Sequence, residues 1–350
     1  MIRKSTLCAC LLLGAAMAAT GCSGQENLNK CRSVDPDAKI TGCTALIQAG
    51  KDTTENLSVI YNNRGTAYDD KGDYDHAIQD FNEAIHLNPN AESAYYGRGY
   101  AYKKKGDYDR AIQDFNEAIH LNPNFERAYY DRGNAYIDKE DYDRAIQEFD
   151  KAIRLNPNDA NAYNNRGVAY ERKEDYGHAI QNYSQAIRLN SNYTNAYGNR
   201  GYAYFAQSNL TAATADFVHT ISAAPSSSAA VYSVLMLHVI MKRQGHDDAQ
   251  QFARVAAAAD LSKWPGPVLK LDLGQMTASE VMMAAASPGT DRQKKWQVCE
   301  ANYFTGEDAL LHHQRTTALA RLKAARDGCP NYAAALVELK RLGASAAPAK

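Results

Sequence analysis

The sequence predicts an all-α solenoid of antiparallel helix pairs. Five segments of 34 residues follow one another, and each opens with a signature such as Tyr61-Asn62-Asn63-Arg64-Gly65-Thr66-Ala67-Tyr68. Small and aromatic residues recur at fixed places within them, and Pro closes four of the five. A period of this length is typical of stacked helical repeats. Each helix pair leaves an apolar face that only the next pair covers, so we expect the pairs to stack into a superhelix.

The repeated columns are regular over all five segments. The segments are Ser58–Ala91, Glu92–Phe125, Glu126–Asp159, Ala160–Tyr193 and Thr194–Ser227. The glycine column is Gly65, Gly99, Gly133, Gly167 and Gly201. The aromatic column is Phe81, Phe115, Phe149, Tyr183 and Phe217. This pattern resembles the tetratricopeptide repeat (TPR), and the resemblance implies a right-handed superhelical solenoid whose first helices line a concave groove.

Elementary packing explains these columns. Gly lets the two helices of a pair approach closely, the aromatic rings fill the space between neighbouring helices, and Pro ends the second helix. An arginine column is followed sixteen places later by a mostly acidic column. We interpret the two as a structural ladder within each pair, weaker where Asn182 replaces the acid. The pairs are Arg64 and Asp80, Arg98 and Asp114, Arg132 and Glu148, Arg166 and Asn182, and Arg200 and Asp216.

The N-terminus predicts export. Arg3 and Lys4 precede an apolar run, Leu7 to Ala19, that is too short to span a membrane. The run ends in Ala19-Thr20-Gly21-Cys22, which resembles a bacterial lipobox and implies a signal peptide over 1–21 and a lipid anchor on Cys22. Ser23, where Asp would signal inner-membrane retention, implies the outer membrane. The alternative is ordinary cleavage after Ala16-Met17-Ala18, which gives a soluble periplasmic or secreted protein.

Cysteine usage agrees with export. Of the seven Cys, two leave with the signal peptide and Cys22 would carry lipid, so four remain. An even number in an oxidising compartment favours two disulfides, Cys31 with Cys43 and Cys299 with Cys329. A four-Cys metal site is the weaker alternative, because the spacings are not CxxC and the two pairs lie at opposite ends of the solenoid. No other cofactor is expected.

The ends of the chain diverge from the repeat. Residues 22–57 predict a linker and a partial repeat, 58–227 the five regular repeats, and 228–298 a divergent helical region. Residues 299–342 predict a TPR-like unit with a capping helix, and 343–350 a disordered tail. The order of Trp264-Pro265-Gly266-Pro267, Leu273-Gly274 and Cys299 to Glu307 resembles the NlpI-type envelope lipoproteins. That resemblance implies an adaptor whose partners are periplasmic proteases or peptidoglycan hydrolases.

The predicted binding surface is the concave groove. By analogy with TPR proteins, fifteen residues of the first helices should face it, and they are rich in Asn and Tyr. Asn can bond a peptide backbone without fixing its sequence, and Tyr gives contact area at low entropic cost. The residues are Asn62, Thr66, Asp69, Tyr96, Tyr100, Lys103, Arg127, Tyr130, Asn134, Asn161, Asn164, Glu171, Asn195, Tyr202 and Phe205. The alternative is that these polar residues are simply solvated.

Other functions find less support. The formal net charge of -1 gives no electrostatic case for nucleic acid. The nine His form no HExxH motif, and the glycines form no phosphate loop, so we expect no enzyme. The sequence therefore predicts an envelope scaffold that binds other proteins. A component of an assembly or secretion complex is the alternative, and homodimerisation stays open.

Overall fold

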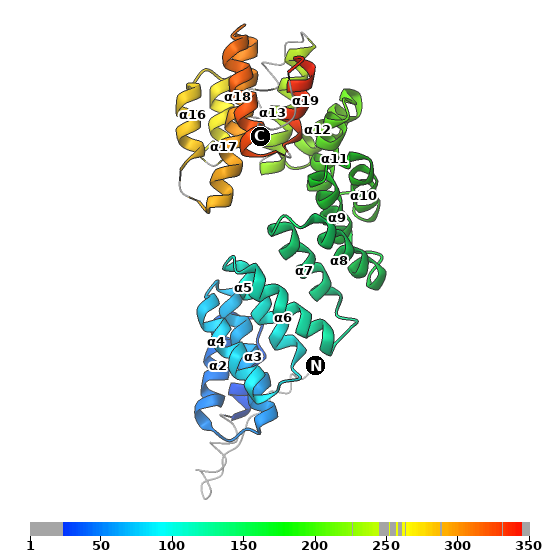
Figure 1. Cartoon of the computed structure of the whole chain (residues 1–350). Coiled ribbons are helices and arrows are strands. Elements are labelled where there is room, and N and C mark those ends of the chain that lie inside the picture. The colour runs from blue at the N-terminus through cyan, green and yellow to red at the C-terminus, as the bar shows by residue number, and fades with distance from the viewer. Residues whose placement is uncertain are drawn as a thin grey trace, which may run out of the picture. The chain divides into compact units, whose positions relative to one another are not determined.

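The computed structural model describes residues 24–225, 227–244, 252, 257, 261–262, 264–287, 289–330 and 332–344. Every regular element in this part of the chain is a helix (Figure 1). The predicted signal peptide, Cys22 and most of the predicted tail lie outside the described residues. None of the described helices combines the length and apolar character that a membrane span needs. The chain divides into two compact units, Met1–Leu155 and Asn156–Lys350.

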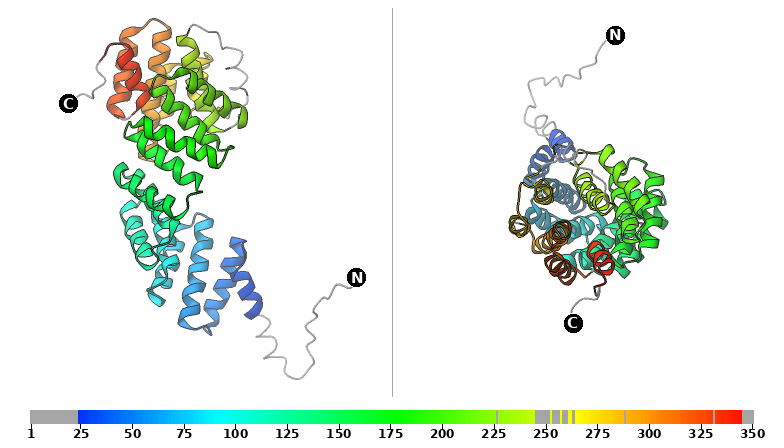
Figure 2. Two further views of the ribbon diagram at one scale, coloured as in Figure 1. Left: turned by 90° about the vertical axis from the view of Figure 1, so that its right-hand side faces the viewer. Right: turned by 90° about the horizontal axis from the view of Figure 1, so that it is seen from above.

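The first unit is a stack of helix pairs. A helical segment over 24–31 precedes the first labelled helix. The helices are α2 (Pro36–Ala49), α3 (Thr54–Asp70), α4 (Tyr74–Leu87), α5 (Glu92–Lys104), α6 (Tyr108–Leu121), α7 (Glu126–Asp138) and α8 (Tyr142–Leu155). Each helix packs against the next one along the chain, so neighbours lie side by side (Figure 2).

The second unit continues the pairs and adds the divergent helices. Its helices are α9 (Ala160–Arg172), α10 (Tyr176–Leu189), α11 (Thr194–Ala206), α12 (Leu210–Ala223), α13 (Ser228–Arg243), α15 (Gly266–Asp272), α16 (Ala278–Ala285), α17 (Asp291–Leu311), α18 (Arg315–Gly328) and α19 (Ala333–Arg341). One hydrophobic core runs from Phe205 to Leu339. Helix α19 packs on both α18 and α11, so the end of the chain returns to the last regular repeat.

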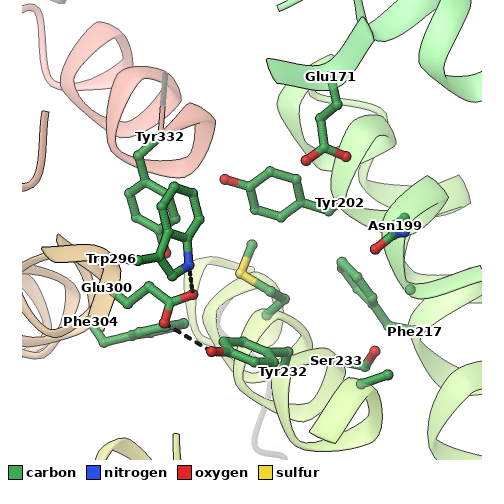
Figure 3. Close-up of a pocket in the computed structure, with 13 residues that line it drawn as sticks. Glu171, Asn199, Tyr202, Phe217, Tyr232, Ser233, Trp296, Glu300, Phe304 and Tyr332 are labelled. Atoms are coloured by element: carbon green, nitrogen blue, oxygen red, sulfur yellow. Dashed lines mark hydrogen bonds between the residues drawn. The ribbon is translucent and has the colours of Figure 1, made fainter. Parts of the chain in front are cut away.

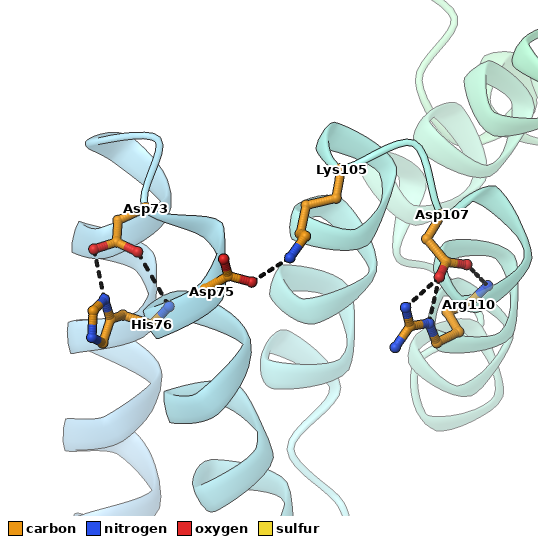
Figure 4. Close-up of polar contacts among 6 residues, drawn as sticks. All are labelled: Asp73, Asp75, His76, Lys105, Asp107 and Arg110. Carbon is orange, nitrogen blue, oxygen red and sulfur yellow. Dashed lines mark hydrogen bonds and ion pairs between the residues drawn. The ribbon is translucent and has the colours of Figure 1, made fainter.

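Local chemistry fixes where the second helix of each repeat begins. An Asp or Asn side chain accepts a hydrogen bond from the backbone N–H three residues later, at 3.1–3.3 Å. This is N-capping, which satisfies a donor that the helix itself leaves unpaired. The capping residues are Asp73, Asp107, Asp141, Asp175 and Asn209. Figure 4 shows two of these caps, with the exposed ion pair of Asp75 and Lys105 between neighbouring repeats.

The turn just before each cap requires left-handed backbone. Gly72 and Gly106 take φ values of 76° and 82°, which Gly adopts without strain. The same place in the next three repeats holds Glu140, Glu174 and Ser208, with φ of 61–62°. These three residues therefore carry backbone strain that the two glycines avoid.

The glycine and aromatic columns meet inside each pair. A Cβ added at any of the five column glycines would lie 2.7–3.0 Å from a ring carbon of the aromatic residue of the same repeat. Real Cβ atoms do not approach this closely, so only Gly permits this packing distance. The rings are almost completely buried, with Phe149 and Tyr183 at 0% exposure.

The arginine ladder is confirmed. Arg64 donates to both carboxylate oxygens of Asp80, at 2.8 and 2.7 Å, and Arg98 does the same to Asp114 at 2.9 and 2.7 Å. Arg98 also donates to Asn82 of the preceding repeat, at 2.6 Å. The column therefore joins repeats as well as the two helices of a pair. The later rungs are Arg132 with Glu148, Arg166 with Asn182, and Arg200 with Asp216.

Two disulfides close the ends of the structure. Cys31 is bonded to Cys43, with a Cα–Cα distance of 4.6 Å, and ties the segment 24–31 to α2. Cys299 on α17 is bonded to Cys329 at the end of α18, with a Cα–Cα distance of 6.1 Å. Both distances lie within the range that disulfides span without distortion.

Candidate protein-binding surfaces

The first candidate surface lies on α3, α5 and α7 of the first unit and is called the unit 1 face below. Asn62, Thr66 and Asp69 lie three and four residues apart on α3, so they share one side of that helix. Thr66 is exposed, and its hydroxyl donates to the Asn62 carbonyl at 2.9 Å. The Oδ1 atoms of Asn62 and Asp69 are shielded from solvent and accept no hydrogen bond from the described part of the chain.

Electrostatics set Asp69 apart. Burial and the neighbouring Asp70 raise its pKa to about 6, against the opposing effect of Lys104 and Lys103. Any hydrogen-bond donor or cation that reaches the Asp69 side chain would favour its ionised form. The Oδ1 atoms of Asn62 and Asp69 therefore form an acceptor pair that the described residues leave unmatched.

On α5 and α7, several predicted residues already have partners. The Tyr96 hydroxyl donates to Asp131 Oδ2 at 2.7 Å, and Lys103 forms an ion pair with the same carboxylate. Asn134 Nδ2 lies 3.5 Å from Asp131 Oδ1. Asp131 was not among the predicted residues, yet it organises three of them. Its pairing links α5 to α7.

Two of the remaining predicted residues of this face make aromatic contacts, and the third is exposed. Arg127 is exposed at the start of α7. Tyr130 contacts Phe149 edge-on, with 5.8 Å between ring centroids. Tyr100 lies beneath the ammonium groups of Lys103 and Lys104, at 4.8 and 5.2 Å from the ring centroid.

In the second unit the predicted groove residues are of three kinds: two are exposed, two are buried, and two line a cavity. Asn161 and Asn195 are exposed. Asn164 is buried, and its Oδ1 accepts from Asn199 Nδ2 at 3.1 Å. For Phe205 the prediction is wrong, because its side chain is completely buried in the hydrophobic core. The divergent helices that follow the regular repeats cover this place.

The other two predicted residues, Glu171 and Tyr202, line a cavity of about 240 Å³. The cavity lies between the first helices α9 and α11 and the later helices α12, α13 and α17, with Tyr332 just before α19 (Figure 3). It is partly open. The lining residues are Glu171, Gly198, Asn199, Tyr202, Phe217, Ala229, Tyr232, Ser233, Met236, Trp296, Glu300, Phe304 and Tyr332.

Glu300 accepts three hydrogen bonds in this cavity. Trp264 Nε1 and the Tyr232 hydroxyl donate to its Oε2 at 2.6 and 2.9 Å, and Trp296 Nε1 donates to its Oε1 at 2.8 Å. Burial raises the pKa of Glu300 to about 7, although these three hydrogen bonds oppose the rise. The side chain is therefore held in one orientation by donors, yet it ionises only near neutral pH.

Glu171 faces Glu300 from the repeat side of the cavity. Its Oε2 accepts from the Tyr183 hydroxyl at 2.8 Å. Burial raises the pKa of Glu171, against the charge of Arg172 and the Tyr183 hydrogen bond. The Arg172 guanidinium stacks 4.1 Å from the centroid of Trp296. Two carboxylates therefore lie in the described lining of the cavity, and the Arg172 guanidinium contacts the Trp296 ring of that lining.

The C-terminal helix contacts this site directly. The Ala334 backbone N–H donates to the Tyr202 hydroxyl at 3.0 Å. Tyr332 is buried, and its ring meets Trp296 edge-on at 5.4 Å. Tyr202, which was expected to face an open groove, therefore contacts the C-terminal helix α19.

Sequence reasoning missed most of this cavity. Tyr232, Trp296, Glu300 and Tyr332 lie outside the regular repeats, where no period places them. One signal was present: both Trp of the chain lie in the divergent half. Both donate to Glu300 in the structure.

Metal and other small sites find little support in the described part of the chain. Within it, no three His, Cys, Asp or Glu side chains are placed to hold a metal ion. A second cavity, of about 170 Å³, lies among His238, Lys242, Asp272 and Arg341.

Comparison with known proteins identifies the repeats. The tetratricopeptide repeat matches residues 58–91, 93–125, 115–147 and 160–193, and a further TPR repeat matches 133–174. This chain is a TPR protein. TPR proteins are in general non-catalytic scaffolds that bind partner proteins. No curated protein matches the sequence.

Several solved structures resemble this TPR protein. PilF of Pseudomonas aeruginosa is 16% identical, with a TM-score of 0.53 over 63% of this chain and 98% of its own, and this likeness shows the fold. MamA is 26% identical, with a TM-score of 0.44 over 45% of this chain and 93% of its own. YrrB, described as a TPR protein with an unusual peptide-binding site, is 21% identical, with a TM-score of 0.46 over 55% and 96%.

Proposed function

We propose that this TPR protein is a non-catalytic adaptor of the bacterial cell envelope that binds partner proteins through its first helices. The unmatched acceptors of the unit 1 face carry the proposal. A buried acceptor without a donor costs about 1–3 kcal/mol, so folding alone does not account for Asn62 and Asp69. The backbone N–H groups of a bound peptide are donors that would satisfy both, once the two side chains rotate toward the ligand.

The envelope part of the proposal is supported by the cysteines and the N-terminus. Disulfides persist in oxidising compartments, and the chain holds two. The lipobox-like Cys22 would anchor the protein to the outer membrane, because buried acyl chains bind a bilayer through about 0.8 kcal/mol per CH₂. The resemblance to NlpI-type lipoproteins suggests periplasmic proteases or peptidoglycan hydrolases as partners.

The binding surface can be tested by combining stability with binding. Asn62→Leu removes the unmatched oxygen, so we expect stability to rise by about 1 kcal/mol while partner binding weakens. Asn56→Leu is the matched control, since Asn56 is an exposed residue of the same helix. Partners crosslinked to the full chain in envelope extracts should be lost with Asn62→Leu plus Asp69→Asn and kept with Asn56→Leu. Identical partner sets in all three proteins would exclude the unit 1 face.

The anchor has a separate test. A Cys22→Ala variant should lose lipid labelling and move from the membrane to the soluble periplasmic fraction. Unchanged fractionation would contradict lipidation, while leaving the test of the unit 1 face unaffected.

A further inference from the structure

The described lining of the cavity in the second unit has acidic side chains and no basic one. The lining holds the carboxylates of Glu171 and Glu300, and none of the thirteen described residues that form it is basic. Arg172 is the nearby cation, and it is stacked on the Trp296 ring. Once both carboxylates are ionised, two negative charges face one guanidinium among the described residues. The interior therefore favours a positive ligand.

Hydrogen bonding points the same way. Ser233 is 1% exposed and lines the cavity, and among the described residues its Oγ has no hydrogen-bond partner. An unmatched buried hydroxyl is costly, and an ammonium or guanidinium N–H would satisfy it as an acceptor. Glu300 Oε1 receives one donor, from Trp296, which leaves acceptor capacity on that oxygen. The site thus presents acceptors that the described side chains around it leave without a donor.

The rest of the wall is aromatic. Tyr202, Tyr232, Trp296 and Tyr332 surround the space between the two carboxylates, with Phe304 on the side of Glu300 (Figure 3). Aromatic faces attract cations through the ring quadrupole, and most strongly where water is excluded. The volume of about 240 Å³ is below the usual 300–1,000 Å³ of small-molecule sites, and it suits a single side-chain end.

We propose that this cavity binds the cationic end of a lysine or arginine side chain presented by a partner protein. Acceptors at Glu171, Glu300 and Ser233 would take its N–H groups, and the tyrosine and tryptophan rings would contact its apolar stem. The protein source of the cation rests on the proposed adaptor function. The cation site itself stands on the cavity alone.

Tryptophan fluorescence of the full chain tests the site, because both Trp donate to Glu300. The probes are the capped peptides Gly-Gly-Xaa-Gly-Gly with Xaa as Lys, Arg or Gln. At pH 8 we expect the Lys or Arg peptide to change the emission saturably, and the Gln peptide to leave it unchanged. An equal response to all three peptides would overturn the proposal.

Variants connect the response to the cavity. Glu171→Gln keeps an oxygen for the Tyr183 hydroxyl, and Ser233→Ala removes only the unmatched hydroxyl; each should weaken binding, Glu171→Gln by about 10- to 100-fold. Glu174→Gln makes the same charge change at an exposed residue of the same repeat and should bind as the natural protein does. Far-UV circular dichroism identifies any variant that fails to fold. Unchanged affinity in folded Glu171→Gln and Ser233→Ala would overturn the site.

The source of the cation is tested separately. Free lysine and putrescine should bind at least tenfold more weakly than the Lys peptide, because they lack a peptide backbone. The reverse order would overturn a side-chain ligand. A cavity that binds the peptides while the unit 1 face captures no partner would refute the proposed function and leave this inference in place.

Discussion

Replacing Glu300 by Gln should remove a pH-dependent loss of stability from the second unit. Burial raises the pKa of Glu300 to about 7, from an ordinary value of 4.5. A raised acid pKa means that the folded state holds its proton more tightly than the unfolded state does. Stability is therefore full below the unfolded pKa and falls as pH rises from 4.5 through 7. The amide of the Glu300→Gln variant does not ionise, so the variant lacks this dependence.

The magnitude follows from the size of the shift. Each unit of difference between the folded and unfolded pKa corresponds to about 1.4 kcal/mol of stability. Most of the loss of stability falls between about pH 5 and 8. The natural protein should lose about 2–3 kcal/mol relative to Glu300→Gln over that interval. The amide disrupts one of the three donor contacts of Glu300, which adds an offset that is constant with pH. Only the slope against pH carries the prediction.

Urea unfolding followed by tryptophan fluorescence measures this slope, because the emission of Trp264 and Trp296 arises beside Glu300. The natural protein, Glu300→Gln and the control Glu174→Gln are compared at several pH values. Glu171 also has a raised pKa, but it is present in all three proteins and cancels in the difference. Parallel stability curves for the natural protein and Glu300→Gln from about pH 5 to 8 would refute the reasoning.

Three further changes have expected results. Gly133→Ala should lower the free energy of unfolding of the first unit by about 1–3 kcal/mol, because its Cβ would lie 2.9 Å from the Phe149 ring; a gain from helix propensity would contradict this. Glu140→Gly should raise stability by about 0.5–1 kcal/mol by relieving left-handed backbone at φ 61°, as measured by urea unfolding. Cys299→Ala plus Cys329→Ala opens a loop with a separation of 30 residues and should cost about 3.6 kcal/mol, and an unchanged midpoint would exclude a stabilising role.

Much of the fold could be predicted because the 34-residue repeat occurs five times in the sequence. Paired columns in the sequence correspond to recurring contacts in the structure. Gly133 lies against Phe149, and Arg64 pairs with Asp80, at the spacings that the alignment requires. A contact that recurs every 34 residues needs no knowledge of distant chain segments, so sequence alone can identify it.

The candidate site could be predicted only in part, because it depends on non-periodic contacts. Tyr202 lies on α11, the helix on which it was expected to face the groove. The backbone N–H of Ala334, 132 residues later in the chain, donates to its hydroxyl. Phe205 was expected beside it on the same face, and the divergent helices bury it. Long-range packing of this kind has no signature in a repeat alignment.

The places where the array departs from its own pattern help to identify the cavity. The aromatic column holds Phe in every repeat except the fourth, where Tyr183 lies against Gly167 just as Phe149 lies against Gly133. Packing therefore does not require the hydroxyl of Tyr183. Its observed partner is Glu171 at 2.8 Å, one of the two carboxylates of the cavity. Because a buried tyrosine hydroxyl needs an acceptor, this substitution is explained by the cavity and not by the stacking of repeats.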